Sequence, residues 1–93
     1  MDSKQELKLI DGTFLPNEAI EILLNLYNQK IKFHELKNFS TQECTGTAHS
    51  YSVQRIPELE VDIETIKKII KDAAEKNQKL IIKSILHIDF VQN

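Results

Sequence analysis

Twelve residues near the end of the chain, KLIIKSILHIDF at positions 79–90, have the length and composition of one long β-strand. Side chains of a strand point alternately to its two faces. One face, called here the dry face, carries residues 80, 82, 84, 86, 88 and 90 and is apolar except for Ser84. The other face mixes isoleucine with Lys79, Lys83, His87 and Asp89. This pattern predicts an antiparallel or mixed sheet with helices on the dry face, because a central parallel strand is apolar on both faces.

The other strand-like segments barely cover this one, even if they are stacked along it. At roughly 3.3 Å per residue, the segment spans about 40 Å. Residues 6–10 (ELKLI) alternate and end at Asp11-Gly12, a dipeptide that favours a tight turn and could form a hairpin with residues 13–15. Residues 30–36 alternate over a similarly short stretch and are predicted to be a strand, although the spacing of Leu36 and Phe39 fits a helical turn equally well. We therefore expect part of the long strand's edge to lack a partner within the chain.

The first helix is predicted at residues 16–29, with Pro16 at its first position and Leu15 as a poor N-cap. Its apolar residues cover an arc of about 200°, wider than the stripe of about 100° that an ordinary surface helix needs. Ile22, Leu24 and Leu26 lie at the margins of this arc. The helix is therefore expected to be covered on two sides.

Less regular sequence follows the first helix. Residues 40–52 are polar and are predicted to be a long loop, and residues 53–59 a short helix that has to accommodate Pro57. A second long helix is expected at residues 63–76, with apolar residues on one side only. The predicted fold is a single α+β domain of two layers, with two long helices on one face of a small mixed or antiparallel sheet of about three strands.

The wide apolar arc and the uncovered strand edge together favour a homodimer. Either the C-terminal strands pair across a two-fold axis, or the first helices pack across it. The residues expected at this interface are Ile22, Leu24, Leu26, Ile85, His87 and Asp89. A monomer whose long strand bends or frays at one end is the alternative.

Few residues indicate chemistry. His34, Cys44 and His49 form the one candidate site for a small enzyme or ligand-binding protein, but no Cys-x2-Cys or His-x3-His spacing accompanies them. His87 and Asp89 share one strand face, which would let the carboxylate raise the histidine pKa, although a solvated surface explains the pair more simply. The sequence predicts no catalytic residue, no metal and no cofactor.

Charge and cysteine content narrow the function classes further. A formal net charge of −2 and a single arginine do not favour binding to nucleic acid or to an anionic membrane. One cysteine forms no internal disulfide, which suits the cytoplasm. The first 12 residues lack the apolar run of a signal peptide. We therefore expect a cytoplasmic, non-enzymatic interaction or regulatory module.

Three stretches, LIDGTFLPNEAIEIL, KIKFHELKNFS and RIPEL, resemble a group of short uncharacterised bacterial proteins of about this length. In that group Ser or Thr precedes the proline of the helix start, whereas this chain has Leu15. The resemblance implies a bacterial origin and no particular activity or site residue.

Overall fold

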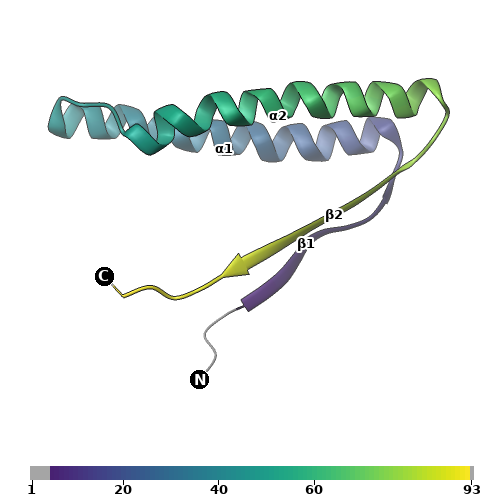
Figure 1. The fold of residues 1–93 in the computed structure, drawn as a ribbon, viewed down its shortest axis with the longest axis horizontal. Coiled ribbons are helices and arrows are strands. Elements are labelled where there is room, and N and C mark those ends of the chain that lie inside the picture. The colour runs from purple at the N-terminus through teal and green to yellow at the C-terminus, as the bar shows by residue number, and fades with distance from the viewer. Residues whose placement is uncertain (1–4, 93) are drawn as a thin grey trace.

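The chain forms a helical hairpin with a two-stranded ribbon attached at its open end. A computed structural model describes residues 5–92, in the order β1 (Gln5–Phe14), α1 (Pro16–Thr45), α2 (Ser50–Glu75) and β2 (Leu80–Ile88). The helices run antiparallel beside each other, and β1 pairs with β2 in an antiparallel sheet (Figure 1). The α+β class is therefore confirmed. The described residues contain two strands rather than the expected three or so.

Helix α1 is twice as long as expected. Glu18 accepts a hydrogen bond from the Leu15 N–H at 2.8 Å, which is half of a capping box, because Leu15 has no side-chain oxygen to return it. The helix ends at Gly46, whose φ of 78° is left-handed and whose N–H donates to the Gln42 carbonyl at 2.8 Å. Residues 30–36 lie inside this helix, so the predicted strand there is wrong. Most of the predicted loop at 40–52 is also helical; only residues 46–49 connect the helices.

Helix α2 begins before its expected start. It runs from Ser50 through the predicted short helix at 53–59 and includes Pro57. Proline removes the bond that the Val53 carbonyl would accept, and Val53 is exposed, so water can replace that bond. The helices predicted at residues 53–59 and 63–76 are therefore parts of one helix.

The core is a narrow seam between the two helices. Its buried apolar residues are Ala19 on α1 and Leu59, Ile63, Ile70 and Ala73 on α2, and Ile10 on β1 is the sixth buried apolar residue among those described. Buried His34 and Ser52 continue the seam toward the tip of the hairpin, which is the end that carries residues 46–49. The seam holds the two antiparallel helices side by side over most of their length (Figure 1).

Strand β1 runs straight through the predicted turn. Asp11 pairs with Lys83 and Gly12 with Ile82, so no hairpin forms at Asp11-Gly12. The ring of Phe14 lies over Gly12, where a Cβ would come within 3.3 Å of it. A bulge between Lys8 and Ile10 is the one irregularity of the ladder. Along its whole length, one edge of β2 is thus paired.

The first half of β2 alternates as predicted for the dry face: Leu80, Ile82 and Ser84 are half-buried, whereas Leu86 and Ile88 farther along are exposed. Directly paired residues of an antiparallel ladder share a face. The pairs on the dry face are Phe14–Leu80, Gly12–Ile82, Ile10–Ser84, Leu7–Leu86 and Gln5–Ile88. The other face pairs Thr13 with Ile81, Asp11 with Lys83, Lys8 with Ile85 and Glu6 with His87.

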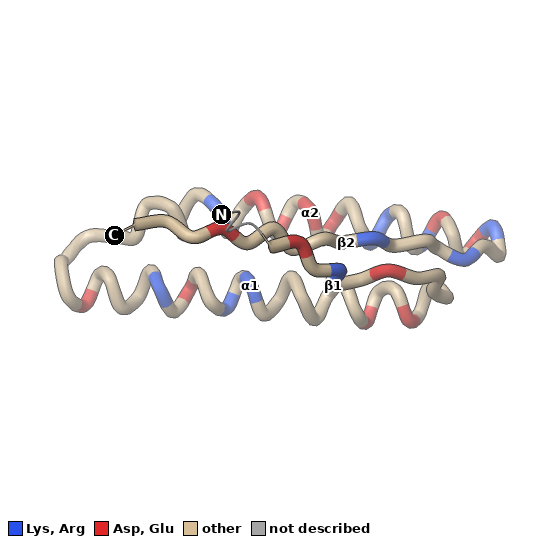
Figure 2. The backbone as a smooth tube through the Cα atoms, turned by 90° about the horizontal axis from the view of Figure 1, so that it is seen from below, with Lys and Arg blue, Asp and Glu red and all other residues tan. Residues whose placement is uncertain are grey.

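The ribbon diverges from the helices instead of lying flat against them. It leaves the open end of the hairpin and points back beneath it at an acute angle (Figures 1 and 2). The base of the ribbon, at Leu80 and Ile82, shares a groove with Leu23, Ile66 and Ile70 of the helices. Farther out, Leu7, Leu86 and Ile88 are exposed. The expected two-layer packing is therefore not confirmed: on the dry face, burial extends from Leu80 to Ile10 and Ser84 and no farther.

The helical state of residues 30–36 predicts a large difference between glycine and alanine at exposed Glu35. Glu35→Gly should be less stable than Glu35→Ala by about 1 kcal/mol, because glycine loses more backbone freedom in a helix. Thermal unfolding of both variants at one protein concentration measures the difference, which corresponds to about 4–8 °C in Tm. Equal stabilities would contradict a helix at this position.

Candidate functional site

The candidate residues His34 and His49 meet in a polar cluster at the tip of the hairpin. Ser52 on α2 joins them: its Oγ lies 3.0 Å from His34 Nδ1 and 2.7 Å from His49 Nδ1. The His49 N–H donates to Asn38 Oδ1 on α1 at 2.8 Å. His49 is also the N-cap of α2, because its Nδ1 accepts from the Ser52 N–H at 3.3 Å. The cluster, defined here as the tip cluster of His34, Asn38, His49 and Ser52, therefore ties both helices to their connection.

Donor and acceptor roles in the tip cluster follow from the cap. His49 Nδ1 accepts from the Ser52 backbone, so it carries no proton and also accepts from the Ser52 hydroxyl. The Ser52 oxygen is then free to accept from His34 Nδ1–H. This assignment leaves His34 Nε2 as a bare acceptor, which is buried and has no hydrogen-bond partner.

The surroundings of His34 oppose its protonation. Only 1% of the residue is exposed, and the rings of Phe33 and Tyr51 approach it edge-on, with centroids at 5.3 and 5.6 Å. Burial lowers the pKa of His34 most, and the positive charges of Lys30 and Arg55 lower it further. His34 is therefore a neutral histidine in the folded protein.

Chemistry at the tip cluster is restricted by access. Ser52 has no exposed surface and His34 almost none, so neither reaches a substrate in solution. Cys44 is a free, exposed thiol in the last turn of α1, and within residues 5–92 it makes no hydrogen bond to either histidine. The described residues also contain no group of three or more His, Cys, Asp or Glu side chains arranged to hold a metal ion. The geometry fits a structural tie better than an active centre.

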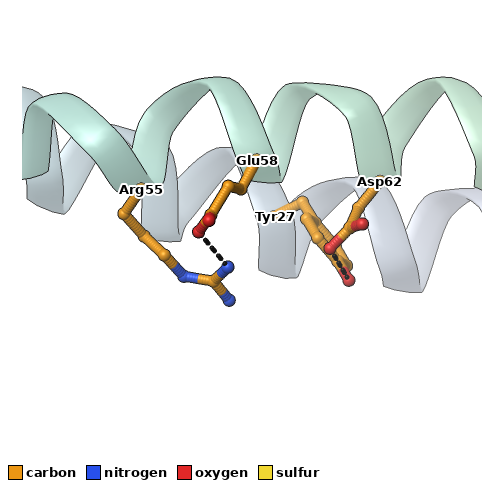
Figure 3. A network of polar contacts seen from close by, with 4 residues as sticks. All are labelled: Tyr27, Arg55, Glu58 and Asp62. Atoms are coloured by element: carbon orange, nitrogen blue, oxygen red, sulfur yellow. Dashed lines mark hydrogen bonds and ion pairs between the residues drawn. The ribbon is translucent and has the colours of Figure 1, made fainter.

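A second polar contact crosses the seam closer to its middle. The Tyr27 hydroxyl on α1 donates to Asp62 Oδ2 on α2 at 3.2 Å, and Arg55 pairs with Glu58 at 3.0 Å one turn away (Figure 3). Partial burial raises the pKa of Tyr27, and the negative charge of Asp62 and the bond to it raise it further. All four side chains project from the same side of the hairpin (Figure 3). The Tyr27–Asp62 hydrogen bond joins α1 to α2 and therefore helps to align the helices.

The expected interface residues lie on two separate surfaces. Ile22 and Leu24 are half-buried on α1, and Leu26 is exposed beside them. Ile85 and His87 lie on the wetter face of β2, and Asp89 directly follows the strand. His87 contacts Glu6 on the neighbouring strand, with Nδ1 3.4 Å from Oε1. The partner of His87 in the structure is therefore Glu6.

Two exposed apolar surfaces stand out beyond those residues. One is the outer dry face, formed by Leu7, Leu86 and Ile88 at the far end of the ribbon. The other lies on the second half of α1 and consists of Phe33, Leu36 and Phe39, each between 56% and 60% exposed. The strand pattern contained the signal for Leu86 and Ile88. The α1 surface was missed because this segment was not expected to be helical, and Ser52 and Asn38 carried no signal in the sequence.

Comparison of the chain with models of protein families, with curated proteins and with solved structures finds no match to any of them. Within the described residues, neither helix has a stretch apolar and long enough to cross a membrane. The function has to be argued from the geometry, and the resemblance to a group of bacterial proteins stays a prediction.

The tip cluster predicts a stability cost for Ser52→Ala. The substitution leaves the buried His34 Nδ1–H without an acceptor and removes the hydroxyl that His49 Nδ1 accepts from, at a cost of about 1–3 kcal/mol. Urea unfolding measures the loss. Ser40→Ala, at an exposed position of the same hairpin, serves as the control and should change little. An unchanged free energy of unfolding in Ser52→Ala would show that the cluster does not tie the helices.

The lowered pKa of His34 predicts a loss of stability in mild acid. The unfolded chain binds a proton at His34 as the pH falls through about 6.5, whereas the folded chain does not. The contribution of His34 to the free energy of unfolding is therefore fully present above that pH and decreases below it. His34→Asn keeps an N–H near the Nδ1 position but does not titrate, so its stability should fall less between about pH 7.5 and 5.5. Identical pH slopes would contradict a neutral buried His34.

Proposed function

We propose that this protein is a non-enzymatic interaction module whose first partner is a second copy of itself. The observation that carries the proposal is the amount of surface that one chain leaves exposed. The chain exposes 7580 Å², whereas a compact monomer of 10.8 kDa exposes about 5,500 Å². Its radius of gyration is 16.8 Å, against about 12 Å for a compact domain of this length.

The excess has the size of a homodimer interface. It amounts to about 2,000 Å² per chain on this scaling. Stable homodimers commonly bury about 1,000–2,500 Å² on each subunit. One further copy is therefore enough to bring the exposed surface of each chain to an ordinary value.

The exposed surface is also rich in apolar side chains, as an interface requires. Among the described residues, six apolar residues are buried, whereas 17 large apolar or aromatic residues are more than one-third exposed. Scattered apolar residues are normal on a monomer, but contiguous ones such as the outer dry face indicate a binding surface. Charges of both signs occur along the helices and the ribbon (Figure 2), so no single-sign field opposes association of two copies.

The proposal extends to a regulatory role in the cytoplasm, in a pathway that the fold does not specify. A small enzyme or ligand-binding protein using His34, Cys44 and His49 is the alternative. It has less support, because His34 is closed to solvent and Cys44 stands apart from the tip cluster in its hydrogen bonding within residues 5–92. Loss of a cellular function in Cys44→Ser would favour that alternative.

A homodimer predicts a particle of twice the chain mass. Sedimentation equilibrium at micromolar concentration should give about 22 kDa, which is the mass of two chains. The Tm should rise with protein concentration, since dimerisation stabilises the folded state by mass action. A particle of 10.8 kDa with a concentration-independent Tm would contradict the proposal.

A further inference from the structure

We infer that two copies join through the free edge of β2, antiparallel to each other, about a two-fold axis at Ser84. The two ribbons then form one four-stranded sheet. The inference rests on the proposed homodimer and adds its geometry. A two-stranded ribbon is marginal in water by itself, whereas four strands with an apolar face and helices against it form a stable layer.

The edges of the ribbon differ in how well they are protected against pairing. The free edge of β1 is interrupted by the bulge between Lys8 and Ile10 and carries Glu6, Lys8 and Asp11. Bulges and charges are the means by which native proteins block edge pairing. Strand β2 shows no bulge in its ladder, contains no proline or glycine, and has Lys83 as its one Lys, Arg, Asp or Glu. The free edge of β2 is therefore the one open to a partner.

The dry face limits the possible registers. When two identical strands pair antiparallel, dry-face residues of one copy lie opposite dry-face residues of the other only if the two-fold axis passes through a residue position. An axis at Lys83 would set the two Lys83 side chains against each other, and like charges directly opposite are unfavourable. An axis at Ile85 would place Ile81 opposite Asp89 and Lys83 opposite His87, which gains no charge pair.

An axis at Ser84 makes the strand complementary to itself. Lys79 then faces Asp89 of the second copy, and the reverse pair forms on the other side of the axis. On the dry face, Leu80 faces Ile88 and Ile82 faces Leu86. An axis at Leu86 also pairs a lysine with Asp89, but it carries Leu80 and Ile81 past the end of the second strand. The register at Ser84 is the one that uses the whole of β2.

This register also places the outer dry face of each ribbon next to the base of the other ribbon. Leu86 and Ile88 come to lie beside Ile82 and Leu80 of the second copy, which are at the base of its ribbon. In each chain that base shares a groove with the helix residues Leu23, Ile66 and Ile70. The uncovered end of one ribbon is thus placed next to the covered end of the other, which a single chain cannot achieve because its own helices diverge from its ribbon.

Disulfide trapping tests the register. In a Cys44→Ser background, Ser84→Cys places one thiol opposite its own copy, at a Cα separation of about 4.5–5.5 Å, within the range that a disulfide spans. Mild oxidation should convert most of the protein to a covalent dimer on a non-reducing gel. Lys83→Cys and Ile85→Cys are the matched controls: each alone should crosslink poorly, but an equimolar mixture should crosslink, because position 83 faces position 85 of the second copy.

A charge exchange gives a second readout that needs no cysteine. Lys79→Asp and Asp89→Lys each set like charges against each other twice per dimer, and each should weaken dimerisation about tenfold at low salt. The double variant restores opposite charges and should recover the affinity. Sedimentation equilibrium measures all three.

The outcomes separate the two proposals. A background protein that sediments as a monomer would overturn the homodimer itself. A dimer in which Ser84→Cys stays uncrosslinked, and the double charge variant gives no rescue, would overturn the β2 register only. If such a dimer dissociated on Phe39→Lys, the α1 surface would be the interface instead.

Discussion

The exposed end of the ribbon follows from one geometric constraint: the two helices pack on each other along their length and meet the sheet only near its base. The buried residues of each helix face the other helix in the seam, where the small residues Ala19 and Ala73 let the backbones approach. The ribbon is held at its base alone, so its dry face is covered for about half its length. An ordinary α+β domain of this size would close the helices down over the sheet. Here the seam prevents that closure, and the apolar surface left over has to be covered from outside the chain.

The sequence predicted the C-terminal strand of this fold better than its helices. The parity of KLIIKSILHIDF was sufficient to assign the dry face correctly, because the side-chain alternation of a strand is strict and local. The second half of α1 was missed because its seam positions include His34 and Asn38, which are polar and interrupt the apolar period. Their partners, Ser52 and His49, are more than ten residues away. A local pattern contains no information about such a contact.

The predicted turn at Asp11-Gly12 failed for a related reason. The dipeptide is compatible with a tight turn, but it is also compatible with an extended strand when a long partner offers a ladder. Strand β2 supplies that ladder past both residues, and the ring of Phe14 fills the space that Gly12 leaves on the dry face. Tertiary pairing therefore overrides the local preference. The candidate site divides in the same way: His34 and His49 do meet, through a serine that the sequence did not single out, whereas Cys44 stays apart.

The tip cluster lies at the end of the helices opposite to the start of the ribbon, and it fixes how the two helices are aligned. An apolar seam alone tolerates a shift of one helix past the other by a turn. The bonds that His49 donates to Asn38 and His34 donates to Ser52 break on such a shift, so they select one alignment. That alignment sets where Phe14 and Leu80 leave the helices, and their pairing starts the ladder. Because a slip of one residue would exchange the two faces of β2, the register of β2 with β1 fixes which face of the ribbon is left exposed at its far end.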